Sequence, residues 1–241
     1  RLVLTLAWLS LPVAAAAQVP RLLVPAASTD FLSRFDYLLA IETLSGDDPQ
    51  FQWDADFCGE FDIVGGPRGR VSALFNYEAI LGEELQPFDP NQGNYVIELV
   101  GGRRWGRAEA AVVFHHTSRH LGDRAKTFGI AWNHLGAQVT WTEAGDRQAW
   151  QVQGRLVKAV MTDSVDYVLD ASGNVLYERD LRPRLAVVAR GSAIARTIEA
   201  TSLHPAETQV GGRAEVALRV RGGAAHLEFH AGVERRVEAA I

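Results

Sequence analysis

The sequence predicts an all-β protein, an antiparallel transmembrane β-barrel of about ten to twelve strands. From about Phe35 onward, apolar and polar residues alternate, which is typical of strands whose two faces lie in different environments. Short clusters of Gly, Asp and Pro interrupt this alternation at intervals. After the first apolar run, no stretch reaches the ~18–20 uninterrupted apolar residues that a membrane-spanning helix needs. Any crossing of a membrane must therefore use strands.

The clearest alternation runs from Phe51 to Ile63. One face carries apolar residues and the other carries acidic or amide residues, Gln52, Asp54, Asp56, Glu60 and Asp62. The same separation recurs from Arg213 to Arg221, and again where Leu227, Phe229 and Val233 alternate with His226, Glu228, His230 and Glu234. The other predicted strands are Phe35–Thr43, Val71–Leu81, Asn94–Val100, Arg107–Ser118, Phe128–Trp141, Trp150–Val160, Asp166–Asp170, Val175–Glu178 and Leu185–Arg190.

Turn-forming clusters separate these predicted strands. Gly supplies positive φ, and Asp, Asn and Ser bond to their own backbone, so these residue types mark reversals of the chain. Because the links are short, consecutive strands are expected to pair antiparallel. The predicted turns and loops are Gly46–Pro49, Gly65–Pro67, Pro87–Gly93, Gly145–Asp146, Ser172–Asn174 and Gly211–Gly212.

Alternation does not show which face of the sheet is the inner one. A soluble barrel turns its apolar face inward and a membrane barrel turns it outward. Strands of about ten residues, polar faces with both charge signs and aromatic residues near strand ends favour the membrane version. A soluble periplasmic sandwich or a lipocalin-like barrel is the alternative. The aromatic residues are Trp53, Tyr95, Trp105, Trp132, Trp141 and Trp150.

The first residues resemble an export signal. Arg1 precedes an apolar run from Leu2 to Val13, and the small residues 14–17 follow, which is the order of a secretory signal peptide. We expect a signal peptide over residues 1–17 and a single outer-membrane barrel domain over 18–241, located in a bacterial outer membrane. The alternative is a short N-terminal core helix. One feature opposes the membrane version: many such barrels end in an aromatic residue, whereas this chain ends in Ile241.

Composition excludes several classes of protein. The net charge of -5 and the absence of a basic stripe argue against nucleic-acid binding. Cys58 is the only cysteine, so the chain can form neither an intramolecular disulfide nor a multi-cysteine metal site. We interpret Cys58 as an inert small residue.

The densest group of reactive residues lies at the end of the predicted strand Arg107–Ser118. His116 and Ser118 are two positions apart, so both side chains share one strand face, as a serine nucleophile and its base require. That face also carries apolar residues, where a polar pair is costly unless it has a role. The next strand brings Asn133 into the same apolar row. Asn133 is therefore the candidate to orient His116.

This block resembles two known groups. Residues 116–123, His-Thr-Ser-Arg-His-Leu-Gly-Asp, resemble a family of bacterial envelope proteins of unknown function, and the likeness spans about residues 71–141. More distantly, the pair His116 and Ser118 followed by Asn133 resembles outer-membrane phospholipase A, a family of twelve-stranded barrels. Lipid A deacylases of the outer membrane carry a similar His-x-Ser pair on the barrel wall.

The second resemblance implies roles for three residues. Ser118 would be the nucleophile, His116 the base and Asn133 the orienting residue, and the reaction would be hydrolysis of an acyl ester. The sequence departs from the family in two ways. Arg119 stands where the family has Asn, and the segment between Ser118 and Asn133 is longer. These departures put the loop-borne calcium site of that family in doubt here.

Two other interpretations of these polar residues remain open. His116, His120 and Asp123, with His115 as a further ligand, could hold a divalent ion, although their spacing fits no recognised zinc pattern. The acidic row from Asp54 to Asp62 could line a cation-selective pore or bind calcium. We favour a barrel interior in which arginines on other strands neutralise that row, with candidates Arg103, Arg155, Arg184, Arg190, Arg219 and Arg221.

The sequence therefore predicts an outer-membrane barrel with a lipid acyl-hydrolase site at Ser118, His116 and Asn133. Calcium is the candidate cofactor. Membrane lipid and the outer-membrane assembly machinery are the expected partners, and a homodimer is a further expectation. The alternative from another class is a non-enzymatic envelope barrel, either structural or a narrow pore.

Overall fold

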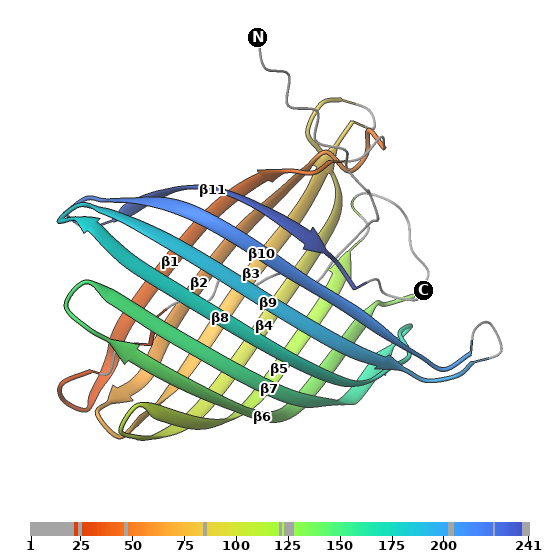
Figure 1. Ribbon diagram of the computed structural model, residues 1–241. Helices are drawn as coiled ribbons and strands as arrows, with labels where there is room; N and C mark the ends of the chain where they lie inside the picture. Colours follow the sequence, from red (N-terminus) through yellow and green to blue (C-terminus); the bar gives the residue numbers. More distant parts are fainter. Residues whose placement is uncertain are drawn as a thin grey trace, which may run out of the picture.

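The structure, a computed structural model, is a single antiparallel sheet in which each strand pairs with its neighbour in sequence (Figure 1). It describes residues 22–23, 26–45, 48–83, 86–120, 122, 128–201, 205–223 and 225–237. The signal peptide predicted over residues 1–17 lies outside these residues. The strands are β1 Asp30–Thr43, β2 Trp53–Gly66, β3 Gly69–Gly82, β4 Asp89–Trp105, β5 Ala108–His120, β6 Ala131–Ala144, β7 Gln148–Asp163, β8 Tyr167–Arg182, β9 Leu185–Ile198, β10 Glu207–Arg221 and β11 His226–Arg235.

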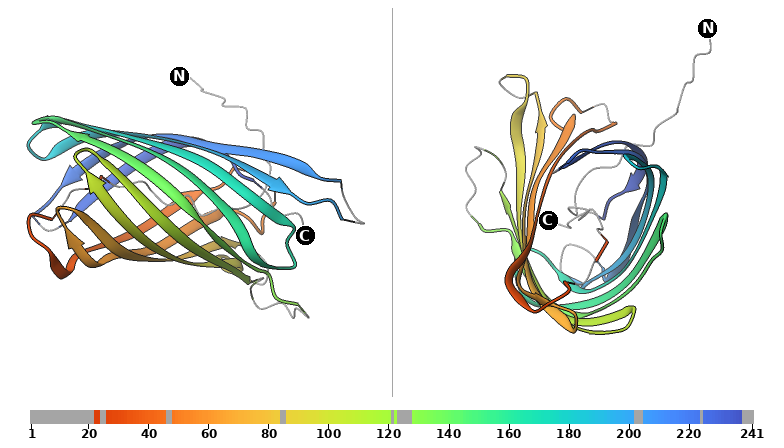
Figure 2. Two further views of the ribbon diagram at one scale, coloured as in Figure 1. Left: turned by 90° about the horizontal axis from the view of Figure 1, so that it is seen from below. Right: turned by 90° about the vertical axis from the view of Figure 1, so that its left-hand side faces the viewer.

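The sheet curls into a half-barrel with a concave inner face and a convex outer face (Figure 2). Apolar side chains stand exposed on the outer face, with Phe35 71% and Val112 61% accessible. Charged and amide side chains are buried on the inner face, and Glu78 is only 1% accessible. The all-β class and the antiparallel pairing predicted from the alternation are confirmed. In the described part of the chain, no helix is long and apolar enough to cross a membrane.

Two of the predicted turns lie inside strands, and most of a third, Pro87–Gly93, belongs to β4, which begins at Asp89. Ser172–Asn174 is in the middle of β8, where Gly173 pairs with Gly154 of β7 and Asn174 donates a side-chain hydrogen bond to Gln153 Oε1 at 3.0 Å. The predicted strands Asp166–Asp170 and Val175–Glu178 are therefore one strand. Gly211–Gly212 likewise lies within β10. Glycine can form a turn, or it can lie inside a strand and allow another backbone to approach closely. The sequence alone does not distinguish these two roles.

Ion pairs cover the inner face and connect strands that are far apart in the sheet. Arg155 of β7 reaches Glu98 of β4 at 2.5 Å, and Arg213 of β10 reaches Glu42 of β1 at 2.5 Å. His230 of β11 also lies 3.0 Å from Glu42. Because β1 and β11 are the two edges of the sheet, these last two contacts bring its edges together across the inner face.

Three acids of the β2 row, Asp54, Glu60 and Asp62, are neutralised by arginines other than those predicted, whereas Asp56 accepts a hydrogen bond from Asn76 Nδ2 at 2.7 Å. The partners of the three acids are Arg34 and Arg70, from β1 and β3, and Arg236, which follows β11. The prediction of Arg103 was wrong because Arg103 points to the outer face, with its guanidinium 5.5 Å from the centroid of the Trp105 ring. Arg184 is exposed in the β8–β9 turn. The other four candidates pair with acids outside the row, Glu98, Glu178, Asp180, Glu215 and Glu228.

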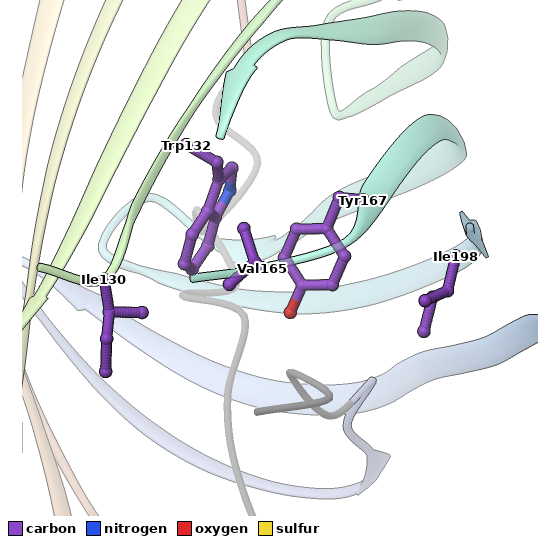
Figure 3. Packing of buried hydrophobic residues seen from close by; sticks show 5 residues of the cluster. All are labelled: Ile130, Trp132, Val165, Tyr167 and Ile198. Carbon is purple, nitrogen blue, oxygen red and sulfur yellow. The ribbon is translucent and has the colours of Figure 1, made fainter. Parts of the chain in front are cut away.

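One apolar cluster lies on the inner side near the start of β6 (Figure 3). Trp132 packs edge-on against Tyr167, with ring centroids 5.2 Å apart, and Ile130, Val165 and Ile198 complete the cluster. Trp132 is only 4% accessible. It is therefore not one of the outward aromatic residues near strand ends, unlike Trp105, Trp141 and Trp150. Cys58 is buried in another inner cluster, with Leu74 and Val96.

Arg236 provides a test of the inner ion pairs. It bonds Asp54, and its Nη1 lies 3.3 Å from Glu78 Oε1, so Arg236→Met leaves two buried carboxylates without this cation. We expect a loss of about 3–5 kcal/mol in the free energy of unfolding, the usual cost of breaking a buried pair. Urea unfolding of the refolded protein in detergent measures it. Arg235→Met, at an exposed neighbouring position, is the control. Equal stability of the two variants would contradict this role.

Candidate functional site

Strand β5 sorts its reactive residues onto two faces. His116, Ser118 and His120 alternate with buried residues and point outward, in line with the exposed Ala110 and Val112. His115 and Thr117 point to the inner face, where His115 Nδ1 lies 2.9 Å from Glu98 Oε2 and its Nε2 lies 3.0 Å from Thr117 Oγ1. The outer face is apolar elsewhere along β5, so the outward polar residues form a separate group.

Asn133 lies directly opposite His116 on the neighbouring strand β6. His116 Nδ1 and Asn133 Oδ1 are 2.5 Å apart. A carbonyl oxygen only accepts hydrogen bonds, so Nδ1 must be the protonated nitrogen. In the neutral ring this leaves the lone pair on Nε2, which is the form that a general base needs. Asn133 also donates from Nδ2 to Met161 Sδ at 3.8 Å, which agrees with this orientation of its amide.

Ser118 is one row nearer the end of the strand, and its hydroxyl is bonded to His120. The distance from Ser118 Oγ to His120 Nε2 is 3.2 Å. The structure therefore places all three predicted site residues on one face and joins His116 to Asn133, but it pairs Ser118 with His120 rather than with His116. The pairing of Ser118 with His120 was not predicted from the sequence. The spacing would have allowed this prediction, because His120 is also two positions from Ser118.

An aromatic row leads to Ser118 across the outer face. Phe57, Tyr77, Tyr95 and Ser118 are successive cross-strand partners on β2, β3, β4 and β5. The ring centroids of Tyr77 and Tyr95 are 4.7 Å apart, and Tyr95 meets the ring of His120 edge-on at 5.0 Å. The adjacent row on the same outer face, at the level of His116, is apolar and contains the exposed side chains of Phe75 and Ile97. Ser118 therefore lies between the row that carries the two tyrosines and the apolar surface at the level of His116.

The predicted metal site is not assembled by the described residues. His115 is on the opposite face from His116 and His120, because odd and even positions of a strand point apart. Asp123 lies outside the described residues. Within the described ranges, the one group with metal-ligand geometry is Glu42, Glu215 and His230. Arg213 bonds both carboxylates of that group and already supplies a positive charge there.

No family model matches this chain, and no curated protein and no solved structure matches it either. The interpretation of the site therefore rests on its geometry and on the motif.

The hydrogen bond between His116 and Asn133 predicts a fixed tautomer. In ¹⁵N spectra of the histidine-labelled protein in detergent micelles, we expect His116 to carry its proton on Nδ1 at a pH where the ring is neutral. Asn133→Ala removes the acceptor, so the ring should lose this fixed tautomer. The His115 signals of the same sample are the internal control, since Glu98 and Thr117 still hold that ring. An unchanged His116 tautomer in Asn133→Ala would contradict the assignment.

Proposed function

We propose that the protein is an outer-membrane β-barrel that hydrolyses acyl esters of lipids at Ser118. The observation that carries this proposal is the bond between His116 and Asn133 on a largely apolar outer face, one row from the hydroxyl of Ser118. A serine, a histidine and a residue that orients the histidine are the parts of a nucleophilic hydrolase site. Their position on an apolar surface suits a substrate with acyl chains.

Two outward aromatic rows support insertion in a membrane. One is the tyrosine row at Ser118, and the other lies at Trp105, Trp141, Trp150 and Tyr177. Along β5, the first row meets Ser118 and the second meets Ala108, ten positions away. Ten residues at about 3.3 Å each, tilted by about 40°, give a height of roughly 25 Å, the usual height of the apolar band of such barrels.

Among the cations on the outer face are Arg103 and Lys158. Arg103 is two residues from Trp105, so it belongs to the second aromatic row. Lys158 lies nearer the middle of the band, beside Leu135. Its long stem can cover apolar surface while the ammonium reaches toward the head groups. Both residues are therefore compatible with a membrane location.

The chemistry follows from the orientation of each group. With its proton on Nδ1, His116 presents the lone pair of Nε2 as a base. On a strand rising about 3.3 Å per residue, His116 and Ser118 are about 6.6 Å apart along the chain. A rotation of Ser118 about χ1, together with local bending of the strand, would turn its hydroxyl from His120 toward His116 as substrate binds. Such bonds often form fully only in the complex with substrate.

The resemblance to outer-membrane phospholipase A supports the same roles for Ser118, His116 and Asn133. Calcium would supply electrophilic assistance to the ester carbonyl if a loop site exists. The loop after His120 lies largely outside the described residues. Assays with calcium and with chelator therefore belong in the test.

The alternative is a non-enzymatic envelope barrel. The ion pairs that cross the inner face, such as Arg155 to Glu98, favour a structural barrel over an open pore. A structural barrel has no need of a bonded His–Asn pair on its apolar face, where polar side chains cost free energy. We favour the hydrolase because it gives this polar pair a role and a structural barrel does not.

Membrane insertion is tested by a charge in the middle of the apolar band. Val112→Arg should lower the free energy of unfolding in bilayers by about 2–4 kcal/mol, the cost of arginine at the midplane of a barrel. Trp105→Arg, in the aromatic row, should cost only about 0–1 kcal/mol from its charge. Urea titration in phospholipid vesicles measures both. If Val112→Arg is neutral, the outer face is in water and the membrane proposal fails.

Hydrolysis is tested by fatty-acid release from phospholipid and from lipid A in mixed micelles. Ser118→Ala and His116→Ala should each lower the rate by about 10³-fold or more, because they remove the nucleophile and its base. Asn133→Ala should lower it about tenfold, the effect of losing one hydrogen bond of about 1–1.5 kcal/mol.

The matched control for Ser118→Ala is Thr117→Val, on the same strand but the opposite face. It should retain the rate of the unsubstituted protein. Each variant must show the folded, heat-modifiable mobility of a barrel on gels. If the folded protein releases no fatty acid from either lipid, with or without calcium, the site is not a hydrolase and the envelope-barrel alternative stands.

A further inference from the structure

We propose that His120 protonates the alcohol that leaves when the ester is cleaved, so that two histidines divide the proton transfers at Ser118. This inference rests on the proposed hydrolase function and adds a catalytic residue to it. Its basis is the position of His120 relative to the serine, to the aromatic row and to the apolar band.

Ser118 lies between two outward histidines, each two residues away on β5. The Nδ1 atom of His116 is hydrogen-bonded to Asn133 Oδ1, at 2.5 Å. His120 turns its Nε2 toward Ser118 Oγ, at 3.2 Å, and its ring is held edge-on by Tyr95. An ester whose carbonyl carbon reached Ser118 Oγ would therefore have one imidazole on each side along the strand.

The surface around the two histidines sets the direction of a bound lipid. On the His116 side, β4 and β6 present Ile97, Leu99 and Leu135, which are exposed and apolar. On the other side are the tyrosine row and His120. Aromatic rows of membrane barrels lie at the level of lipid head groups. The acyl chain of a substrate would extend past His116, so the alcohol half of the ester would lie beside His120.

The proton transfers balance if His120 begins as an imidazolium and His116 as a neutral ring. As Ser118 Oγ bonds to the carbonyl carbon, its proton passes to His116 Nε2. The bond from carbon to the alcohol oxygen then breaks, and that oxygen takes the proton from His120 Nε2. In the second half, water attacks the acyl-serine and gives a proton to His120. The bond to Ser118 breaks, Oγ recovers its proton from His116, and the fatty acid leaves.

The test compares two esters of one acyl chain that differ in the leaving alcohol. A p-nitrophenolate leaves without being protonated, whereas a glycerol or alkyl alkoxide needs a proton. The variant is His120→Phe, which keeps a ring against Tyr95 and removes the acid. We expect hydrolysis of the glycerol ester to fall about 100-fold and hydrolysis of the nitrophenyl ester to stay within about threefold. Tyr77→Phe, in the same aromatic row, is the control and should change neither rate selectively.

The outcomes separate this inference from the function on which it rests. If His120→Phe lowers both rates equally, or lowers neither, His120 does not act on the leaving group, although Ser118-dependent hydrolysis remains. If the unsubstituted protein cleaves neither ester at a rate above that of Ser118→Ala, the hydrolase proposal fails and this inference fails with it. A His120→Gln variant, which keeps a donor but cannot transfer a proton, should behave as His120→Phe does.

Discussion

The structure depends on the pairing of arginine with carboxylate across the concave face of the sheet. An alternating strand that exposes its apolar side must bury its polar side, and a buried charge without a partner is costly. Here, guanidinium groups bridge carboxylates from several strands at once, as Arg34 does with Asp36, Glu60 and Asp62. The planar fork of arginine suits such multiple pairing better than an ammonium does. Lys158, the lysine within the described ranges, is exposed on the outer face and takes no part in these inner pairs.

Much of this arrangement could be predicted because alternation is a local property. From Trp53 to Asp62 the observed burial of β2 follows the period of two except at Ala55, and a register shift after Asp62 then leaves Val64 exposed. Identifying the arginine that meets each carboxylate requires the curvature of the sheet, which no local pattern contains. Arg103 is a different case, since it shares the outward odd positions of β4 with Leu99 and Trp105, and the alternation itself places it on the outer face. Trp132 was misjudged because it was grouped with the other aromatic residues by its type and its place near a strand end, whereas the unbroken alternation of β6, which turns Leu135 outward, turns Trp132 inward.

The candidate site shows the same division. The shared face of His116 and Ser118 follows from their spacing, and the meeting with Asn133 follows from the pairing of β5 with β6. The spacing does not predict which histidine bonds to Ser118, because His116 and His120 are each two residues away from it. That choice depends on side-chain rotamers and on the ring of Tyr95, which a neighbouring strand supplies. Because both positions hold histidine, the direction in which a lipid binds decides which imidazole lies beside its alcohol half.

The contacts at the sheet edges bear on how the chain folds. Strand pairing joins neighbours in sequence, so most contacts can form progressively as hairpins. The bonds of Glu42 to Arg213 and of Asp54 to Arg236 instead close spans of 171 and 182 residues. Contacts with such large sequence separation carry a high loop-closure entropy and form late. Glu42 and Asp54 would therefore lack these two arginines until β10 and the segment after β11 have joined the sheet, so the stability of the first strands depends on the last ones.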